Sequence, residues 1–330
     1  MMAVAYSAQL FLLAGVSFLA LGSVSSAGLV SSLRASLVRV EPHARHRALV
    51  WLAALPAFIA FALLLTVSLP SLVALIAPGA DHCTLHEDGH AHLCFRHLPS
   101  SGISVVFTLC LVFSVSYCML RAALALLELL RAMRVVNALA ATGEERSDLG
   151  VTVLETTRPV CLAAGLLHPR VLLSRGLLDS LSPPELAVIL AHERAHVRRR
   201  DAAIAGMVRV LVSAHLPWVK RWLLRELEIA AEQSCDEDSA RLLNDRLVVA
   251  ATILRVERAA HRENAVLGVV SMGFGAQAIE RRVQALLSEP SPPRSLRAWV
   301  MGFGLAVAIA LSFANELHHV TESVLSSIAS

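Results

Sequence analysis

The clearest chemical signal in this chain is a pair of histidines that flank a glutamate, in the order His192, Glu193 and His196. On an α-helix, positions four apart lie on the same face, so both imidazole rings can bind one metal ion. The glutamate between them is turned partly aside, where it can take a proton from a water molecule rather than bind the metal. The spacing is typical of zinc-dependent peptide hydrolysis, and it predicts a metal site here.

Zinc needs a third protein ligand, and the acidic residues further along the chain are the candidates. They are Glu226, Glu228, Glu232, Asp236 and Glu237. Glu228, Glu232 and Asp236 are four residues apart, so one helix presents all three on one stripe. One carboxylate can complete the coordination, and another can hold a ligand histidine from behind through its free ring N–H. Spacing alone leaves Glu228 and Glu232 tied, and a solvated acidic face is the alternative.

The helix that carries the two histidines should begin at Ser182. Residues 182–185 read Ser-Pro-Pro-Glu, which is a capping box with proline in the first turn. Three arginines at residues 198–200 suit the negative end of the helix dipole. These signals favour a well-defined helix over a chance pair of exposed histidines.

Three short strands should precede this helix, at residues 151–155, 160–164 and 170–174, after a polar turn at 142–148. A protease can bind an extended substrate by pairing it with the edge strand of such a sheet. The alternative is an ordinary structural sheet, and the sequence does not indicate which edge is free.

The composition indicates a membrane protein, because 56% of the 330 residues are hydrophobic, 17% are charged and the mean hydropathy is +0.63. Four segments can span a bilayer, at about residues 8–30, 48–70, 103–120 and 298–314. Residues 202–219 are also apolar but contain Arg209, and a charge within a span is costly. We interpret them as a buried helix of the peptidase domain. The net charge of +3 gives no reason to expect nucleic-acid binding.

Arginines on the connections between spans orient the chain. They gather after the first span, after the third span and before the fourth, at Arg34, Arg39, Arg45, Arg47, Arg131, Arg134, Arg294 and Arg297. The positive-inside rule places both termini outside and the histidine helix in the cytoplasm.

The predicted fold class is therefore a multi-pass α-helical membrane protein with four spans and a cytoplasmic, mainly-α zincin domain of α+β type. Residues 1–130 hold three spans and an outer loop at 78–102. Residues 131–295 form the peptidase domain. Residues 296–330 hold the fourth span and a short outer tail.

The outer loop is rich in possible metal ligands. It contains His82, Cys83, His86, His90, His92, Cys94 and His97. Outside the cell, Cys83 and Cys94 are expected to be oxidised to a disulfide. The histidines can bind Zn²⁺ or Cu²⁺, and a solvated loop pinned by the disulfide is the alternative.

His215 and Cys235 are weaker candidates for a chemical role. His215 can act as a second electrophile toward a scissile carbonyl, although we favour a structural role for it. Cys235 can bind a metal, but we favour a small buried hydrophobic residue.

Several stretches together resemble the BlaR/MecR-type integral-membrane zinc metallopeptidases. They are VLLS at 171–174, RGLL at 175–178, SPPELAVILAHERAHVRRRD at 182–201 and AEQSCDEDSA at 231–240. The order of spans, with the peptidase between the third and the fourth, is similar too. The resemblance implies that His192, His196 and Glu232 bind one zinc ion and that Glu193 is the general base. It also implies that Asp236 holds a ligand histidine from behind, and so favours Glu232 over Glu228.

The resemblance further implies a protein substrate and a location in the cell. Such proteins lie in the bacterial inner membrane, and they split a dimeric winged-helix repressor, or lead to its loss, when an outer sensor domain binds a β-lactam. We therefore expect regulatory proteolysis of a repressor encoded nearby, or of the chain itself, as part of transmembrane signalling.

The sequence departs from that family at the sensor, which uses a Ser-x-x-Lys nucleophile. The sole lysine is Lys220, with Pro217 three residues before it, and only a short stretch follows the fourth span. We therefore expect no C-terminal penicillin-binding sensor. Two alternatives remain: a membrane quality-control protease of the HtpX or CAAX-prenyl-protease kind, and a non-catalytic signalling scaffold.

Overall fold

Three long helices carry the apolar segments in a computed structural model that describes residues 2–77, 105–165, 168–266, 274–288, 305, 309 and 311–329. The helices are α1 (Met2–Leu37), α2 (Pro42–Ile76) and α3 (Val105–Thr142). Within them, Ser7–Leu37, Pro42–Val73 and Thr108–Thr142 are long and apolar enough to cross a membrane. At 1.5 Å per residue each helix is roughly 50 Å long, so each extends beyond a hydrocarbon core of about 30 Å. Three of the four predicted spans thus lie within helices that are long and apolar enough to cross a membrane, and most of residues 298–314 lie outside the described parts.

A four-stranded mixed sheet follows α3, in the order β1-β2-β4-β3. Its strands are β1 (Glu144–Arg146), β2 (Val151–Leu154), β3 (Cys161–Ala164) and β4 (Arg170–Ser174). β2 is antiparallel to β1 and parallel to β4, and β3 is antiparallel to β4. Three strands were predicted, but the polar turn at 142–148 was wrong in part, since β1 lies within it. A three-residue charged edge strand lacks the apolar alternation that identifies strands.

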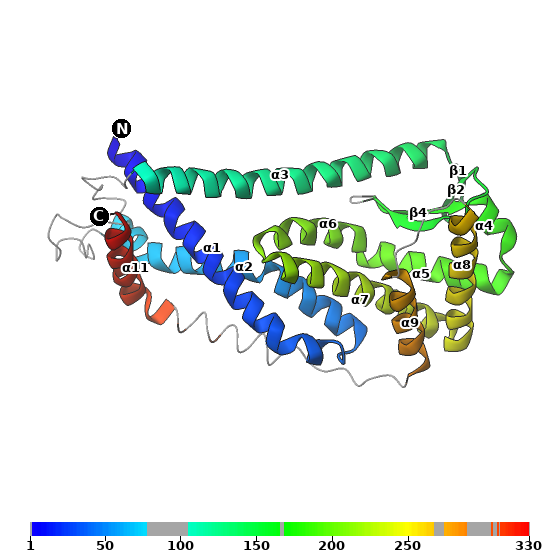
Figure 1. Cartoon of the computed structure of the whole chain (residues 1–330). Coiled ribbons are helices and arrows are strands. Elements are labelled where there is room, and N and C mark those ends of the chain that lie inside the picture. The colour runs from blue at the N-terminus through cyan, green and yellow to red at the C-terminus, as the bar shows by residue number, and fades with distance from the viewer. Residues whose placement is uncertain are drawn as a thin grey trace.

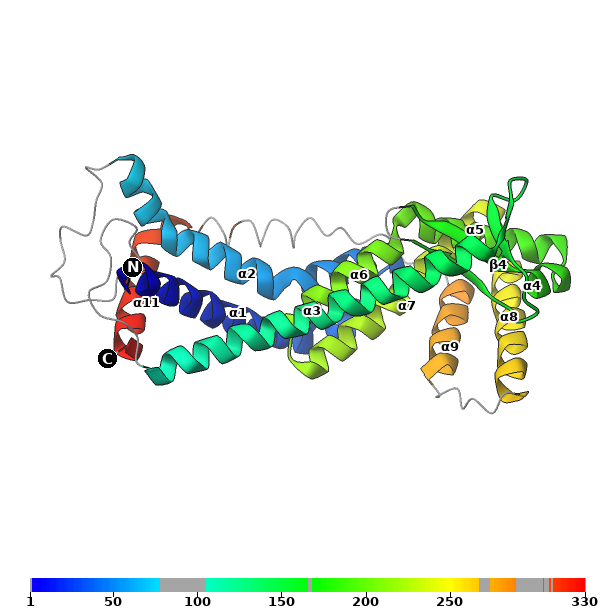
Figure 2. The same ribbon diagram turned by 90° about the horizontal axis from the view of Figure 1, so that it is seen from above.

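The other elements are mostly helices, and α3 runs along them from the end that holds both termini to the sheet (Figures 1 and 2). They are α4 (Arg175–Ser180), α5 (Pro183–Arg199), α6 (Asp201–Leu211), the 3-10 helix η3 (Val212–Ala214), α7 (Pro217–Leu243), α8 (Arg246–Val266), α9 (Phe274–Leu287) and α11 (Ala314–Ala329). The domain beyond the long helices is therefore mainly α-helical with a small sheet.

The core of this domain lies between the sheet and α5. Val153 on β2 and Leu173 on β4 are fully buried and pack in one cluster with Ile189 and Leu190 of α5. Full burial of such side chains contributes about 1.5–3 kcal/mol each. The first turn of α5 is fixed by the predicted capping box, in which the backbone N–H of Ser182 donates to Glu185 Oε2 at 2.9 Å. The sheet and this cap together set the position of the two histidines.

The apolar segment at 202–219 does not form a single helix. It is divided between α6, η3 and the start of α7, and α6 has only 11 residues, too few to cross a bilayer. This hairpin packs against α1 and α2: Val208, Val212 and Val219 share one buried cluster with Val30 and Leu49. Only one face of the segment is therefore buried, and it packs against the long membrane helices, whereas Met207, Leu216 and Trp218 are exposed. The prediction of a single buried helix of the peptidase domain was wrong in these respects.

α1 and α2 approach each other closely at Gly22. A Cβ atom at this position would lie 2.8 Å from the backbone oxygen of Pro56 and 2.9 Å from its Cα. Close backbone approach at small residues is a common way for membrane helices to pack. At the far end of this pair, α11 contacts α2, and His318 Nδ1 donates to the carbonyl oxygen of Val67 at 2.6 Å. The predicted disulfide of Cys83 and Cys94 and the histidines around it lie outside the described residues.

Candidate metal centre

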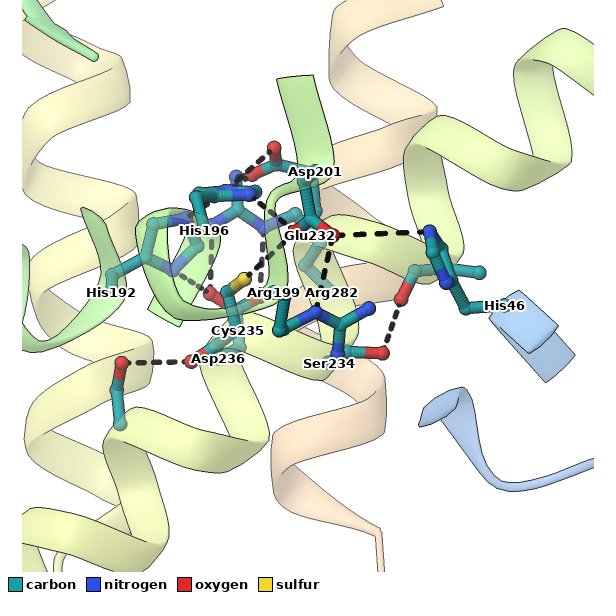
Figure 3. Close-up of polar contacts among 12 residues, drawn as sticks. His46, His192, His196, Arg199, Asp201, Glu232, Ser234, Cys235, Asp236 and Arg282 are labelled. Atoms are coloured by element: carbon teal, nitrogen blue, oxygen red, sulfur yellow. Dashed lines mark hydrogen bonds and ion pairs between the residues drawn. The ribbon is translucent and has the colours of Figure 1, made fainter. Parts of the chain in front are cut away.

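The two histidines of α5 point in the same direction, toward α7. Their Nε2 atoms are 3.1 Å apart, and both rings are largely buried. Glu232 on α7 meets them: its Oε2 lies 3.4 Å from His192 Nε2 and its Oε1 lies 3.3 Å from His196 Nε2. Residues from two helices thus place three ligand atoms in one small group, which can hold a metal ion (Figure 3).

The distances in this group fit zinc. Zinc binds nitrogen and carboxylate oxygen at about 2.0–2.2 Å, so neighbouring ligand atoms of a tetrahedral site are about 3.3–3.6 Å apart. The two histidine Nε2 atoms are 3.1 Å apart, and they lie 3.4 and 3.3 Å from Oε2 and Oε1 of Glu232, respectively. Three protein ligands leave the fourth position open for water or substrate, as in catalytic sites.

A carboxylate stands behind each histidine. His192 Nδ1 lies 2.9 Å from Asp236 Oδ1, and His196 Nδ1 lies 2.8 Å from Asp201 Oδ2. Each carboxylate accepts the N–H of one ring, which directs the other ring nitrogen toward the metal position. Asp236 was expected in this role from the family resemblance, whereas Asp201 was not foreseen.

Asp201 reaches His196 because the chain reverses sharply between α5 and α6. Arg200 adopts the left-handed conformation, with φ of 55°. This conformation costs a non-glycine residue about 1–2 kcal/mol, and it brings the first residue of α6 back over the last turn of α5. Asp201 is also bound by Arg199 Nε at 3.2 Å and by Cys235 Sγ at 3.6 Å.

Arg282 on α9 neutralises the acids on the other side of the site. Its Nε and Nη2 donate to both oxygens of Asp236 at 2.8 and 2.7 Å, and its Nη1 lies 2.9 Å from Glu232 Oε2. Asp236 is almost fully buried, and paired charges of this kind are what make such burial possible.

The charges of the site depend on one another. Burial alone would raise the pKa of Glu232, but its hydrogen bonds to the two histidines lower that pKa well below the usual value. Burial likewise opposes protonation of the histidines, yet hydrogen bonds to Asp236 and Glu232 raise the pKa of His192 to about 9. The pKa of His196 is raised to about 12 by its hydrogen bonds to Asp201, Cys235 and Glu232. A metal ion that binds here therefore replaces protons.

A cavity of about 600 Å³ opens over this group. Its lining includes the three ligand candidates, Glu193, and residues 161–163 of the edge strand β3. Glu193 is buried and lies beside Cys161, whose pKa is raised well above its usual value by burial and then by the charge of Glu193. The edge of the sheet that faces the site is therefore β3.

The N-terminal part of α2 also reaches the site. His46 lines the cavity, and its Nε2 lies 4.0 Å from Asp201 Oδ1 (Figure 3). Its neighbour His43 accepts a hydrogen bond from Arg199 at 2.8 Å, and Arg45 donates to Gln233 on α7. A helix long enough to cross the membrane is thus in contact with the residues that support His196.

The other residues that the sequence offered as metal ligands do not belong to this metal-binding group. Glu228 lines the cavity but is not in the metal-binding group, and Glu226 and Glu237 pair with Arg281 and Arg246. Cys235 is fully buried and supports Asp201, so it contributes to the site from behind.

His215 is not among the residues that line the cavity. Its ring nitrogens contact Ser26 Oγ and the carbonyl oxygen of Ala53, each at 3.1 Å. These contacts join η3 to α1 and α2, and they favour the structural role over that of an electrophile.

Comparison with known proteins identifies related sequences. A family model described as BlaR1 peptidase M56 matches residues 101–286, more than half of the 330 residues. A Protease HtpX homolog of Methanopyrus kandleri is 32% identical over 132 residues, which are 39% of this chain and 41% of that protein. Protease HtpX homolog 2 of Methanosarcina mazei is 38% identical over 65 residues, 19% of this chain and 22% of that protein. The chain thus spans about two fifths or less of these relatives, and no solved structure matches it.

Proposed function

Because the chain belongs to the BlaR1 peptidase M56 family, we propose that it is a membrane-embedded zinc endopeptidase that hydrolyses peptide bonds of a regulatory protein. The observation that carries the proposal is the group of His192, His196 and Glu232, with a carboxylate behind each histidine and Glu193 in the same cavity. A vestigial site in a signalling scaffold would have no need of this complete set.

Each residue of the set has a defined task. His192, His196 and Glu232 would hold zinc, which when bound polarises a peptide carbonyl and makes water nucleophilic near neutral pH. Glu193 takes a proton from the attacking water and passes it to the leaving nitrogen. Asp236 and Asp201 keep the imidazole rings in one orientation throughout.

The substrate backbone binds in this proposal along β3. Cys161, Leu162 and Ala163 line the cavity, and β3 is an edge strand whose other side pairs with β4. An extended peptide can add to this edge through main-chain hydrogen bonds, which bind most sequences equally well. Apolar residues of α5 and α8 that line the same cavity, such as Ile189 and Val256, offer room for apolar side chains.

The substrate we propose is a winged-helix repressor encoded nearby, or the chain itself, in a signalling response. The arginines that flank the spans support a cytoplasmic peptidase domain in a bacterial inner membrane, with both termini outside. The similarity to two proteins named Protease HtpX homolog supports a second candidate, proteolytic quality control of membrane proteins.

The role of Glu193 is tested by Glu193→Gln in the full-length, zinc-loaded protein, co-expressed with the candidate repressor. We expect cleavage to fall at least about a hundredfold, because a general base contributes 10²–10⁴ to such rates. Bound zinc, measured by elemental analysis, should remain. The matched control is Glu228→Gln, which removes another carboxylate of the same cavity and should leave cleavage close to that of the wild type.

Full activity of Glu193→Gln would refute the assignment of the base. The form of the products separates the two candidate functions. A single cut in a folded repressor supports regulatory proteolysis, whereas many cuts in an unfolded protein, such as reduced casein, and none in the repressor support quality control.

A further inference from the structure

Two adjacent arginines of α9 bind carboxylates of α7, but only one of them touches the candidate metal centre. Arg281 donates to both oxygens of Glu226, at 2.7 and 2.8 Å. Arg282 donates to both oxygens of Asp236, and its remaining nitrogen, Nη1, lies 2.9 Å from Glu232 Oε2. Arg282 therefore uses its three side-chain nitrogens on two carboxylates of the site (Figure 3).

We propose that Arg282 is a positioning residue on which two of the three metal ligands depend. It holds the Glu232 carboxylate directly, and it holds the ring of His192 through Asp236. The inference rests on the proposed zinc site. The ligand atoms of Glu232 and His192 are fixed from α9, whereas His196 is fixed separately by Asp201 from α6.

The geometry explains why a guanidinium group is needed here. Arg282 contacts Glu232 at Oε2, which also lies 3.4 Å from His192 Nε2, while Oε1 lies 3.3 Å from His196 Nε2. By holding Oε2, Arg282 fixes the orientation of the Glu232 carboxylate against both histidines. A lysine has only one side-chain nitrogen, so it cannot reproduce the planar guanidinium group, which places three nitrogens on the two carboxylates.

The placement of Arg282 makes the site depend on α9, which lies beyond both helices that carry the metal ligands in the sequence. α9 is held on α7 not only by the two arginines but also by Gln233, which donates to the backbone oxygen of Arg281 at 2.7 Å. Gln233 is the neighbour of Glu232 and also accepts a hydrogen bond from Arg45 of α2. Docking of α9 on α7 thus determines whether two ligands are in place.

The test uses three variants of the full-length protein in detergent: Arg282→Gln, Arg282→Lys and, as matched control, Arg281→Gln. Zinc affinity is measured by competition with a chromophoric chelator, and cobalt(II) is substituted to record the visible spectrum of the site. Loss of a residue that orients ligands typically weakens metal binding 10–100-fold. We expect that loss for Arg282→Gln, about tenfold for Arg282→Lys, and less than threefold for Arg281→Gln. The cobalt spectrum should change only in the two Arg282 variants.

Thermal melts of each variant show whether it folds. If Arg282→Gln does not fold, Arg282→Lys carries the test, because it keeps the positive charge. Wild-type zinc affinity and an unchanged cobalt spectrum in the folded Arg282 variants would overturn the inference. Equal losses for Arg281→Gln and Arg282→Gln would overturn it too, since only general docking of α9 would then matter. A wild-type protein that binds no zinc would overturn the proposed function itself, and this inference with it.

Discussion

The close approach of α1 and α2 at Gly22 gives a prediction whose magnitude follows from the structure. In Gly22→Ala, the new Cβ would lie 2.8 Å from the backbone oxygen of Pro56 and 2.9 Å from its Cα. Ordinary contacts begin near 3.4 Å, so one helix backbone must retreat by about 0.6 Å. Backbone atoms cannot rotate away as a flexible side chain can, so the helix pair itself must open.

Overpacking of this kind costs about 1–3 kcal/mol. The same chain offers a control in Gly15→Ala, because nothing lies within 4 Å of a Cβ atom at Gly15. Both substitutions gain the same intrinsic helix preference of alanine over glycine, about 1 kcal/mol in water. The difference between the two variants therefore isolates the contact, and we expect Gly22→Ala to be less stable than Gly15→Ala by about 1–3 kcal/mol.

The measurement is equilibrium unfolding of each purified variant in mixed micelles titrated with SDS. Gly22→Ala should unfold at a lower SDS fraction than the wild type, and Gly15→Ala at the same or a higher one. Zinc affinity should also fall in Gly22→Ala, because His43 and His46 near the start of α2 contact Arg199 and Asp201, respectively. Identical unfolding of the two variants would refute the close packing of α1 on α2 at this point.

Three further predictions concern the site and the helix that carries it. Asp201→Asn should weaken zinc binding 10–100-fold in a chelator competition, because His196 loses the carboxylate that orients it. Ser182→Ala should lower the free energy of unfolding by about 1 kcal/mol in a denaturant titration, because the N-cap of α5 is lost. Iodoacetamide at pH 8 should label Cys161 at least about tenfold more slowly in the folded than in the unfolded protein, as seen by mass spectrometry, because burial and then Glu193 raise its pKa and so reduce the thiolate.

Each of these has a result that would contradict it. Asp238→Asn is the control for Asp201→Asn, since Asp238 contacts His43 of α2 but no ligand histidine, and equal losses in both would refute the role of Asp201. An unchanged midpoint for Ser182→Ala would mean that the cap does not stabilise α5. Rapid labelling of Cys161 in the folded protein would show that its thiol is not held in a partly buried position beside Glu193.

Local signals explain what could be predicted from the sequence. The pair His192 and His196 and the cap at Ser182 depend on spacings within one helix, which a sequence displays directly. Glu228 and Glu232 could not be separated by spacing, because they share a helical face. The rotation of α7 against α5 decides between them, and it brings Glu232 to the histidines.

The roles of Arg282 and Asp201 could not be predicted from the sequence, because they depend on contacts that no local sequence pattern indicates. Arg282 lies 46 residues after Asp236, and no local pattern links them. Asp201 is only five residues from His196, but the link depends on the left-handed conformation of Arg200, within a run of arginines that gives no sign of a turn. Arg209 correctly indicated that residues 202–219 do not span a membrane. The helices against which α6 packs could not be predicted, because those contacts join distant segments.

The hairpin of α6 and α7 has a consequence for how the chain is made. Its buried residues Val208, Val212 and Val219 pack against Val30 and Leu49, which leave the ribosome some 160 or more residues earlier. The first two helices are therefore already synthesised when the peptidase segment emerges, and the hairpin can pack against them as it folds. A gene fragment that starts after them would give a domain with an uncovered apolar face, and its product should aggregate unless α1 and α2 are supplied from a second gene.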